Sequence, residues 1–471
     1  MEKFKSINWG FIIAIIFWCA ITLIRVFYHS PWYDESHAWT IAKELNLIEL
    51  FQFMRTEGHT FLWYLVLMPF AKNDFMYPHS MLLLNWFFCL VAIVILWLKA
   101  PFNNWIKFLI SFSFPFLGLY PVIARCYSIG IMFLFILIAI DNIKLRHPNW
   151  YATLLILLAN TSLMGTIPAT VLGVRFACEM VKNKQKILVP FSIAIFGAVL
   201  IILQLFGCVE EGLSIYENKQ TIDFVDNIKT VLMQSTAYFE AITIVIALIA
   251  SIVFYVKNRI VPKFFIFSML LMAGLFCVYF GRLWHLLFIL VYFICSCWLL
   301  FDRSDLKYKN LINFALIIVL IPWLIYSPIG KDNNTIWNNL KNLMAKDILL
   351  DKNLTNSTVI IFRQFDTVIQ PYLEKSNITL VNYCSNELLN HNTMSFYNSK
   401  NCSRDFKLDS QLIVLSNEVF DKWYEDEKLY LFTHNKVKLV GEDIKALNLN
   451  YNFVLYKDYG LNYLWKVEKI K

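Results

Sequence analysis

The chain has 471 residues, of which 58% are hydrophobic and 16% charged, and its formal net charge is +8. Soluble domains are roughly 45–50% apolar and about 25% charged, and a single water-soluble core stops growing at about 250–300 residues. The composition therefore excludes a cytosolic enzyme, a disordered chain and a small disulfide-stabilised protein, and it predicts a polytopic membrane protein. The positive excess lies in short segments between apolar runs, so no nucleic-acid partner is expected.

Apolar runs that could cross a bilayer, which takes about 20 helical residues, recur as far as Tyr326. The first has no cleavage pattern after it and predicts a retained anchor rather than a removed signal peptide. The pair on either side of Gly165 is short for two crossings, so the count there stays open. Phe61–Ala71 is shorter still and predicts an interfacial or re-entrant helix. The eleven expected spans are Trp9–Phe27, Ser80–Leu98, Ile106–Tyr120, Tyr127–Ile140, Tyr151–Met164, Thr166–Val181, Ile187–Phe206, Tyr238–Val256, Phe264–Phe280, Leu283–Phe301 and Leu311–Tyr326.

Every second connection between these spans is basic, as the positive-inside rule requires of cytoplasmic loops. The opposite connections are the long stretch Tyr28–His79 and the acidic loop Gly207–Ala237. A cytoplasmic N-terminus and an odd number of spans then place everything after Ser327 outside. The basic connections contain Lys99, Lys107, Lys144, Arg146, Lys182, Lys184, Lys186, Lys257, Arg259, Lys263, Arg303, Lys307 and Lys309.

After Gly330 the sequence becomes polar and alternates short β-rich runs with helix-like stretches, which is typical of a small α/β domain. We therefore expect a mainly α protein with two domains: a transmembrane bundle of about 11 spans at 1–329, whose first outer loop (28–79) carries surface helices, and an extracytoplasmic α/β domain at 330–471. This second domain is expected to dock or shape an acceptor rather than to hold a second active site. The expected strands are Thr358–Phe362, Ile378–Tyr383, Gln411–Leu415, Val437–Val440, Phe453–Tyr456 and Tyr463–Val467, and the expected helices are Phe365–Lys375 and Glu418–Tyr430.

Cysteine use gives no disulfide framework. Most of the ten cysteines lie inside expected spans, where they behave as small apolar residues. Cys384 and Cys402 lie in the outer domain and could pair in an oxidising compartment.

Two adjacent carboxylates, Asp34 and Glu35, follow the first span in the segment Trp-Tyr-Asp-Glu-Ser-His-Ala-Trp. A helix from about Glu35 to Met54 would lie on the membrane surface and hold Asp34 at its N-terminal end, where the helix dipole favours negative charge. The alternative is that Asp34 only caps this helix and Glu35 is a first-turn acid.

Further polar groups occur at the same expected membrane face. The turn Glu57-Gly58-His59 follows the surface helix, and it could equally be a polar turn with an exposed histidine. Arg125 lies between the third and fourth spans, and Arg282 and His285, three residues apart, share a helix face at the tenth. Each arginine could merely extend toward lipid headgroups, but together these residues predict an outward-facing polar pocket.

These motifs resemble the membrane-embedded GT-C glycosyltransferases, the group of the protein O-mannosyltransferases and the lipid A aminoarabinose transferases. The likeness is to a bacterial branch with the patterns Asp-Glu-Ala-x-x-Trp, Glu-Gly-His-Pro-x-Leu-Trp-Tyr and Ala-Arg-x-Tyr, and it covers approximately Ile7–Phe301 in architecture. This sequence has Ser36 where the pattern has Ala, and Thr60 where it has Pro. The resemblance implies an integral protein of the bacterial cytoplasmic membrane that transfers a sugar from a polyprenyl-phosphate-linked donor to a glycan, lipid or protein acceptor on the extracytoplasmic face.

Within that resemblance, Asp34 is the expected general base, because a positioned carboxylate can accept the proton that the acceptor hydroxyl loses. Glu35 is the second catalytic candidate. A divalent metal, Mg²⁺ or Mn²⁺, between Asp34 and a phosphate oxygen is left open, since no cofactor is required by the spacing. The residues expected to bind the donor phosphate are Arg125, Arg282, His285 and Tyr127, and those expected to orient the acceptor or the base are Glu57, His59 and His37.

Two rival functions remain on the sequence alone. A polytopic lipid or glycan transporter or flippase would also carry outer charges, but transporters usually place ionisable residues near the bilayer midplane, and the expected spans are nearly free of charge except at their ends. A receptor or scaffold that binds through its outer domain would tolerate neutralisation of the Asp34 segment.

Overall fold

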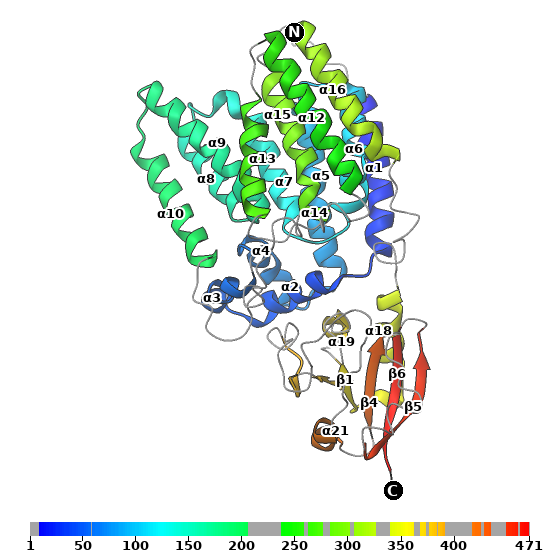
Figure 1. Ribbon diagram of the computed structural model, residues 1–471. Coiled ribbons are helices and arrows are strands. Elements are labelled where there is room, and N and C mark those ends of the chain that lie inside the picture. The colour runs from blue at the N-terminus through cyan, green and yellow to red at the C-terminus, as the bar shows by residue number, and fades with distance from the viewer. Residues whose placement is uncertain are drawn as a thin grey trace, which may run out of the picture.

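The computed structural model describes residues 9–57, 59–205, 237–258, 262–276, 283–301, 306–325, 340–361, 368–373, 376–383, 385–390, 417–424, 428–434, 449–459 and 462–470. These residues form a mainly helical protein with a C-terminal region built on a six-stranded mixed sheet. Figure 1 shows a bundle of helices with the sheet region beyond one of its ends, which we call the sheet-facing end, and the chain termini at opposite ends of the molecule. Three short helices lie at the sheet-facing end: α2 (Tyr33–Glu44), α3 (Leu47–Glu57) and α4 (Leu62–Ala71).

Within the part of the chain that the structure describes, three helices are long and apolar enough to cross a membrane: α1 (Trp9–Tyr28), α5 (His79–Lys99) and α9 (Leu163–Lys182). On α1, the side chains of Phe17 and Ile24 are about 60% exposed, as apolar side chains that contact lipid would be. These features associate the protein with a membrane. The other apolar helices of the bundle are α7 (Tyr127–Ala139), α8 (Pro148–Ala159), α10 (Leu188–Leu205), α12 (Ala237–Asn258), α13 (Lys263–Phe276), α15 (Phe288–Phe301) and α16 (Leu306–Ile325).

The expected span Ile106–Tyr120 is not one helix. The structure has α6 (Asn104–Phe112), which Asn103 caps by accepting a hydrogen bond from the Ile106 amide, and then a π-helical turn, η1 (Pro115–Leu119). Proline at position 115 has no N–H to continue α6, so the helix ends before it. Isolated π-helical turns are frequent at functional sites, and this one leads directly into the turn that carries Arg125.

The break near Gly165 lies slightly earlier than expected. Helix α8 ends at Ala159, and Ser162 caps α9 by accepting a hydrogen bond from the Gly165 amide, so Gly165 belongs to the first turn of α9. A side chain there would overlap the Leu158 carbonyl and the Thr161 hydroxyl, which explains the glycine. The 12 residues of α8 extend only about 18 Å, so this segment is short for a full crossing of the hydrocarbon core.

The single surface helix expected from Glu35 to Met54 is wrong in two respects. Asn46 divides it, because its side chain accepts hydrogen bonds from the amides of Ile48 and Glu49 and thereby starts a second helix, α3. In addition, α2 does not lie open on a membrane surface. Its residues from Glu35 to Ala42 are all buried within the protein.

The C-terminal sheet has the strand order β3-β2-β1-β4-β6-β5. Its centre, β2-β1-β4, is parallel, and the remaining pairs are antiparallel. Apolar clusters cover both faces, with Val359 and Ile361 on one and Ile360 on the other, as is typical of parallel strands. The strands are β1 (Thr358–Ile361), β2 (Thr379–Asn382), β3 (Glu387–Leu388), β4 (Leu429–His434), β5 (Tyr451–Asp458) and β6 (Asn462–Lys469), and the helices here are α18 (Leu340–Leu350), α19 (Gln370–Leu373) and α21 (Asn417–Trp423).

The α/β character of this region is confirmed, and four expected runs coincide with β1, β2, β5 and β6. The expected helix Glu418–Tyr430 is wrong at its end, because α21 stops at Trp423 and Leu429 begins β4. That strand lies between β1 and β6 and is buried from Leu429 to Thr433, so its residues lack the polar alternation of a half-exposed strand. The expected helix Phe365–Lys375 is described only from 368 to 373, where the structure has the short helix α19. Other expectations lie outside the described residues: Gln411–Leu415, Val437–Val440, Cys384 and Cys402.

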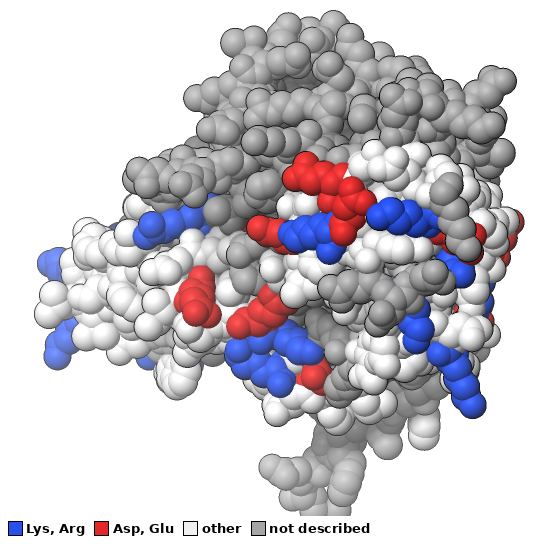
Figure 2. Space-filling model, turned by 90° about the horizontal axis from the view of Figure 1, so that it is seen from below, with Lys and Arg blue, Asp and Glu red and all other residues white. Residues whose placement is uncertain are grey.

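Seen from the end that carries the sheet, acidic and basic side chains lie side by side rather than in one field of a single sign (Figure 2). Lys457 is an example within the sheet region, since its ammonium group contacts Asp347 at 2.8 Å and Asp351 at 2.9 Å. Among the described residues of this face, charge is therefore largely compensated locally.

The expected topology can be tested with single cysteines at two exposed lysines, Lys352 beside the sheet and Lys184 at the opposite end of the bundle. In intact cells, a membrane-impermeant maleimide should label Lys352→Cys and should label Lys184→Cys only after permeabilisation. The parent chain measures labelling of the native cysteines. Equal labelling of both variants in intact cells would contradict the topology.

Candidate functional site

The start of α2 is anchored by the side chain of Glu35, which is fully buried. One of its carboxylate oxygens accepts hydrogen bonds from His29 Nε2 at 2.8 Å and from the Trp32 amide at 2.7 Å, and the other accepts from the Ala124 amide at 2.6 Å. His29 follows α1, Trp32 is the N-cap of α2, and Ala124 belongs to the turn between η1 and α7. A single carboxylate therefore joins the end of α1 and the start of α2 to a turn that lies 89 residues further along the chain.

This anchor brings Asp34 against Arg125, the residue that follows Ala124. Arg125 Nη1 lies 3.1 Å from Asp34 Oδ2, and the side chains are 13% and 41% exposed. An ion pair screened by solvent to this degree contributes little to folding, whereas breaking a fully buried pair costs about 3 kcal/mol or more. Glu35 thus accounts for most of the stability here, and the Asp34–Arg125 pair is the more exposed part of the arrangement.

The guanidinium group of Arg125 also contacts His59, since Arg125 Nη2 lies 2.9 Å from His59 Nε2. Burial and, second, the charge of Arg125 lower the pKa of His59 to about 3, so the ring is neutral at physiological pH. Its Nε2 therefore accepts a hydrogen bond from Arg125 and its Nδ1 carries the proton. That Nδ1 is buried and has no hydrogen-bond partner among the described residues.

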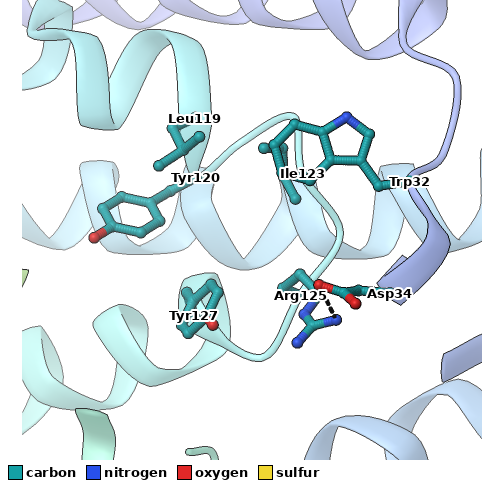
Figure 3. A pocket seen from close by; sticks show the side chains of 7 residues that line it. All are labelled: Trp32, Asp34, Leu119, Tyr120, Ile123, Arg125 and Tyr127. Carbon is teal, nitrogen blue, oxygen red and sulfur yellow. Dashed lines mark ion pairs between the residues drawn. The ribbon is translucent and has the colours of Figure 1, made fainter. Parts of the chain in front are cut away.

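A narrow pocket opens beside this pair, and its walls are mostly aromatic and aliphatic. Figure 3 shows Asp34 and Arg125 pointing toward one another, with Trp32 and Ile123 on one side of them and Tyr127 on another. The volume of about 10 Å³ is roughly that of one water molecule, so a larger ligand would require side chains to move. The pocket is lined by Trp32, Asp34, Leu119, Tyr120, Ile123, Arg125 and Tyr127.

The other expected phosphate ligands occupy different positions. Tyr127 lines the pocket and its hydroxyl lies 3.0 Å from His285 Nε2. His285, on the short helix α14 (Leu283–Leu286), is buried and contacts Tyr127 rather than lining the pocket. Arg282 lies outside the described residues.

The residues expected to orient the acceptor form a neighbouring group. Tyr64 donates a hydrogen bond to Glu57 at 3.1 Å, and His37 Nδ1 lies 3.7 Å from the other Glu57 oxygen. The His37 ring also stacks on Tyr33, with ring centroids 5.3 Å apart. The structure thus brings Glu57 and His37 together, while His59 belongs to the Arg125 group.

Sequence reasoning missed His29. Its position at the end of an apolar span, six residues before Glu35, is the signal that could have pointed to a buried partner for that acid. Concerning a metal, the part of the chain that the structure describes contains no group of three or more His, Cys, Asp or Glu residues arranged to hold an ion. Asp34 is instead paired with a cation.

Comparison of the sequence with models of protein families and with curated proteins found no match.

The role of Glu35 predicts a large loss of stability on truncation. Glu35→Ala would leave two buried amides and His29 without their acceptor, and we expect it to lower the free energy of unfolding by roughly 3 kcal/mol. Thermal unfolding in nanodiscs measures this. Glu44→Ala, at the exposed end of the same helix, is the control, and equal midpoints for both variants would contradict the anchor.

The lowered pKa of His59 predicts a pH dependence of stability. Between pH 6.5 and about 3, the unfolded chain binds a proton at this histidine and the folded chain does not, so stability falls as the pH falls. His59→Gln should reduce this acid-induced loss, measured as the unfolding midpoint at pH 7 and pH 5. His147→Gln, at an exposed histidine, should follow the wild type, and so would His59→Gln if this assignment were incorrect.

Proposed function

We propose that the protein is a membrane-embedded glycosyltransferase of the GT-C type, which transfers a sugar from a polyprenyl-phosphate donor to an acceptor hydroxyl. The observation that carries the proposal is the Asp34–Arg125 pair, at 3.1 Å, in a pocket at the end of an apolar bundle. A carboxylate beside a cation supplies the two groups that the reaction needs, a proton acceptor and a phosphate ligand.

In the reaction, Arg125 binds the phosphate of the donor, for which a guanidinium group is well suited because it offers two parallel N–H donors. One of these groups is directed at Asp34 and the other at His59 in the structure described here. A phosphate that takes over Arg125 Nη1 would release Asp34 from its partner. Donor binding would thereby prepare the base for the acceptor.

The transfer itself is a single displacement. Asp34 takes the proton of the acceptor hydroxyl, whose oxygen forms a bond to the anomeric carbon of the sugar. The bond from that carbon to the phosphate oxygen breaks, and the polyprenyl phosphate leaves with the electron pair. The charge that grows on the leaving phosphate is stabilised by Arg125 and by the hydroxyl of Tyr127, which lines the same pocket.

Glu35 takes no proton in this proposal, because its oxygens are already occupied by three donors and its side chain is fully buried. Glu57 and His37 are placed to contact an acceptor from the α3 side. The aromatic walls formed by Trp32 and Tyr120 suit a sugar ring or the first isoprene units of the donor.

The alternative of a transporter or flippase is less well supported by where the described charges lie. Tyr127 begins α7 at the Arg125 site, whereas Asp141, just after the other end of α7, forms a second group of ions with Arg175 and Lys144. The 13 residues of α7 separate these two groups by about 20 Å. Ionisable side chains at the two ends of a helix fit membrane faces better than a midplane transport site.

The test is Asp34→Asn in cells that lack the native gene, with Asp74→Asn as the matched control because Asp74 also pairs with a cation, Lys43. Loss of a general base costs about 10²–10⁴ in rate. We therefore expect Asp34→Asn to reduce transfer at least about 100-fold, so that one sugar is lost from the surface glycans and polyprenyl-phosphate sugar accumulates. Mass spectrometry of glycans and extracted lipids measures both, at matched protein levels. Normal glycans with Asp34→Asn would refute the catalytic role.

A further inference from the structure

Helix α2, which carries Asp34, is enclosed from two sides. Helix α4 packs against it from the bundle, and α19 of the sheet region packs against it from the other side. Figure 1 shows α2 between the bundle and the sheet region. A helix of 12 residues is marginal by itself in water, so its position depends on these two neighbours.

One contact between α2 and the sheet region is made through Tyr77 and Tyr372. Ser36, two residues after Asp34, shares a hydrogen bond of 2.9 Å with the hydroxyl of Tyr77. The Tyr77 ring in turn meets the ring of Tyr372, on α19, edge to face with centroids 4.8 Å apart. Aromatic pairs in this geometry contribute about 0.5–1.5 kcal/mol beyond the area they bury.

The side chain of the first residue of α2 packs directly against the sheet region. Tyr33 is 8% exposed and lies in the apolar cluster of one sheet face, together with Ile348 of α18 and Leu373 of α19. Tyr33 and Ser36 therefore flank Asp34 and Glu35. Tyr33 packs on the sheet region directly, and Ser36 is linked to it through Tyr77.

The Tyr372 phenol is well suited to a fixed contact. Burial, and then the neighbouring Tyr77 and Glu35, raise its pKa well above its ordinary value. The side chain stays neutral at all physiological pH values, so the contact does not change with pH.

We infer that the sheet region is a positioning element for the Asp34–Arg125 pair and acts through Tyr372 and Tyr77. This inference builds on the proposed function, because it gives the second domain a role in the same site. A displacement of about 1 Å at a reacting group can cost 100-fold in rate. Tyr372 and Tyr77 are positioning residues, since neither lines the pocket.

The first measurement needs no substrate. Hydrogen–deuterium exchange of the full chain in nanodiscs should show amides of Tyr33–Glu44 exchanging at least about tenfold faster in Tyr372→Ala than in the wild type. Tyr372→Phe keeps the ring and should restore wild-type exchange. Tyr456→Ala is the matched control, because Tyr456 packs on Tyr430 and bonds Asp351 within the sheet region. Unchanged exchange of α2 in Tyr372→Ala, or equal acceleration in Tyr456→Ala, would overturn the inference.

The second measurement is transfer in the glycan assay. Tyr372→Ala should lower turnover about tenfold with little change in the donor concentration at half-maximal rate, and Tyr372→Phe should recover it. Wild-type turnover in Tyr372→Ala despite faster α2 exchange would overturn the positioning role. Failure of the proposed function is distinguishable, since Asp34→Asn would then leave the glycans unchanged while the exchange result for Tyr372→Ala stands.

Discussion

The structure of the site depends on one buried carboxylate. Glu35 accepts hydrogen bonds from His29, from the Trp32 amide and from the Ala124 amide, and so holds the end of α1, the start of α2 and the turn before α7 in one place. Asp34 directly precedes Glu35, and Arg125 directly follows Ala124. The Glu35 anchor thereby holds the two segments from which Asp34 and Arg125 form their ion pair.

Two adjacent acids therefore have different environments. Glu35 faces the protein interior and has both oxygens bonded, whereas Asp34 is 41% exposed and pairs with Arg125. Helical geometry produces this division, because neighbouring residues on a helix point about 100° apart. The guanidinium group of Arg125 likewise has two different sides. One side contacts the neutral ring of His59, and the other contacts the partly exposed carboxylate of Asp34.

The sequence predicted the apolar helices well. It did not predict where helices are interrupted or where a strand is buried on both faces. Apolar runs located α1, α5 and α7 closely, because a lipid-facing helix needs a continuous apolar surface. The break at Pro115 and the helix start at Asn46 were missed, since local caps and prolines interrupt runs whose composition stays apolar. Strand β4 was not predicted, and its first two residues were included in an expected helix, because burial on both faces removes the alternation that marks a strand.

Of the site, the residue types were predictable and their pairings were not. Asp34, His59 and Arg125 stand out as polar groups among apolar spans, but only the fold shows that Arg125 contacts both of the others. The partner of Glu35 could not be predicted, because one of its donors is a backbone amide 89 residues away. Likewise, nothing in the sequence links Tyr372 to Tyr77, which come together only when the sheet region packs on α2.

The most direct test of the central claim is an experimental structure in nanodiscs with a short-chain polyprenyl-phosphate sugar bound. The account predicts that the donor phosphate replaces Asp34 as the partner of Arg125 and that the anomeric carbon faces the freed Asp34 carboxylate. Donor density at the opposite end of α7, beside Lys144 and His147, with the Asp34–Arg125 pair still intact, would contradict it.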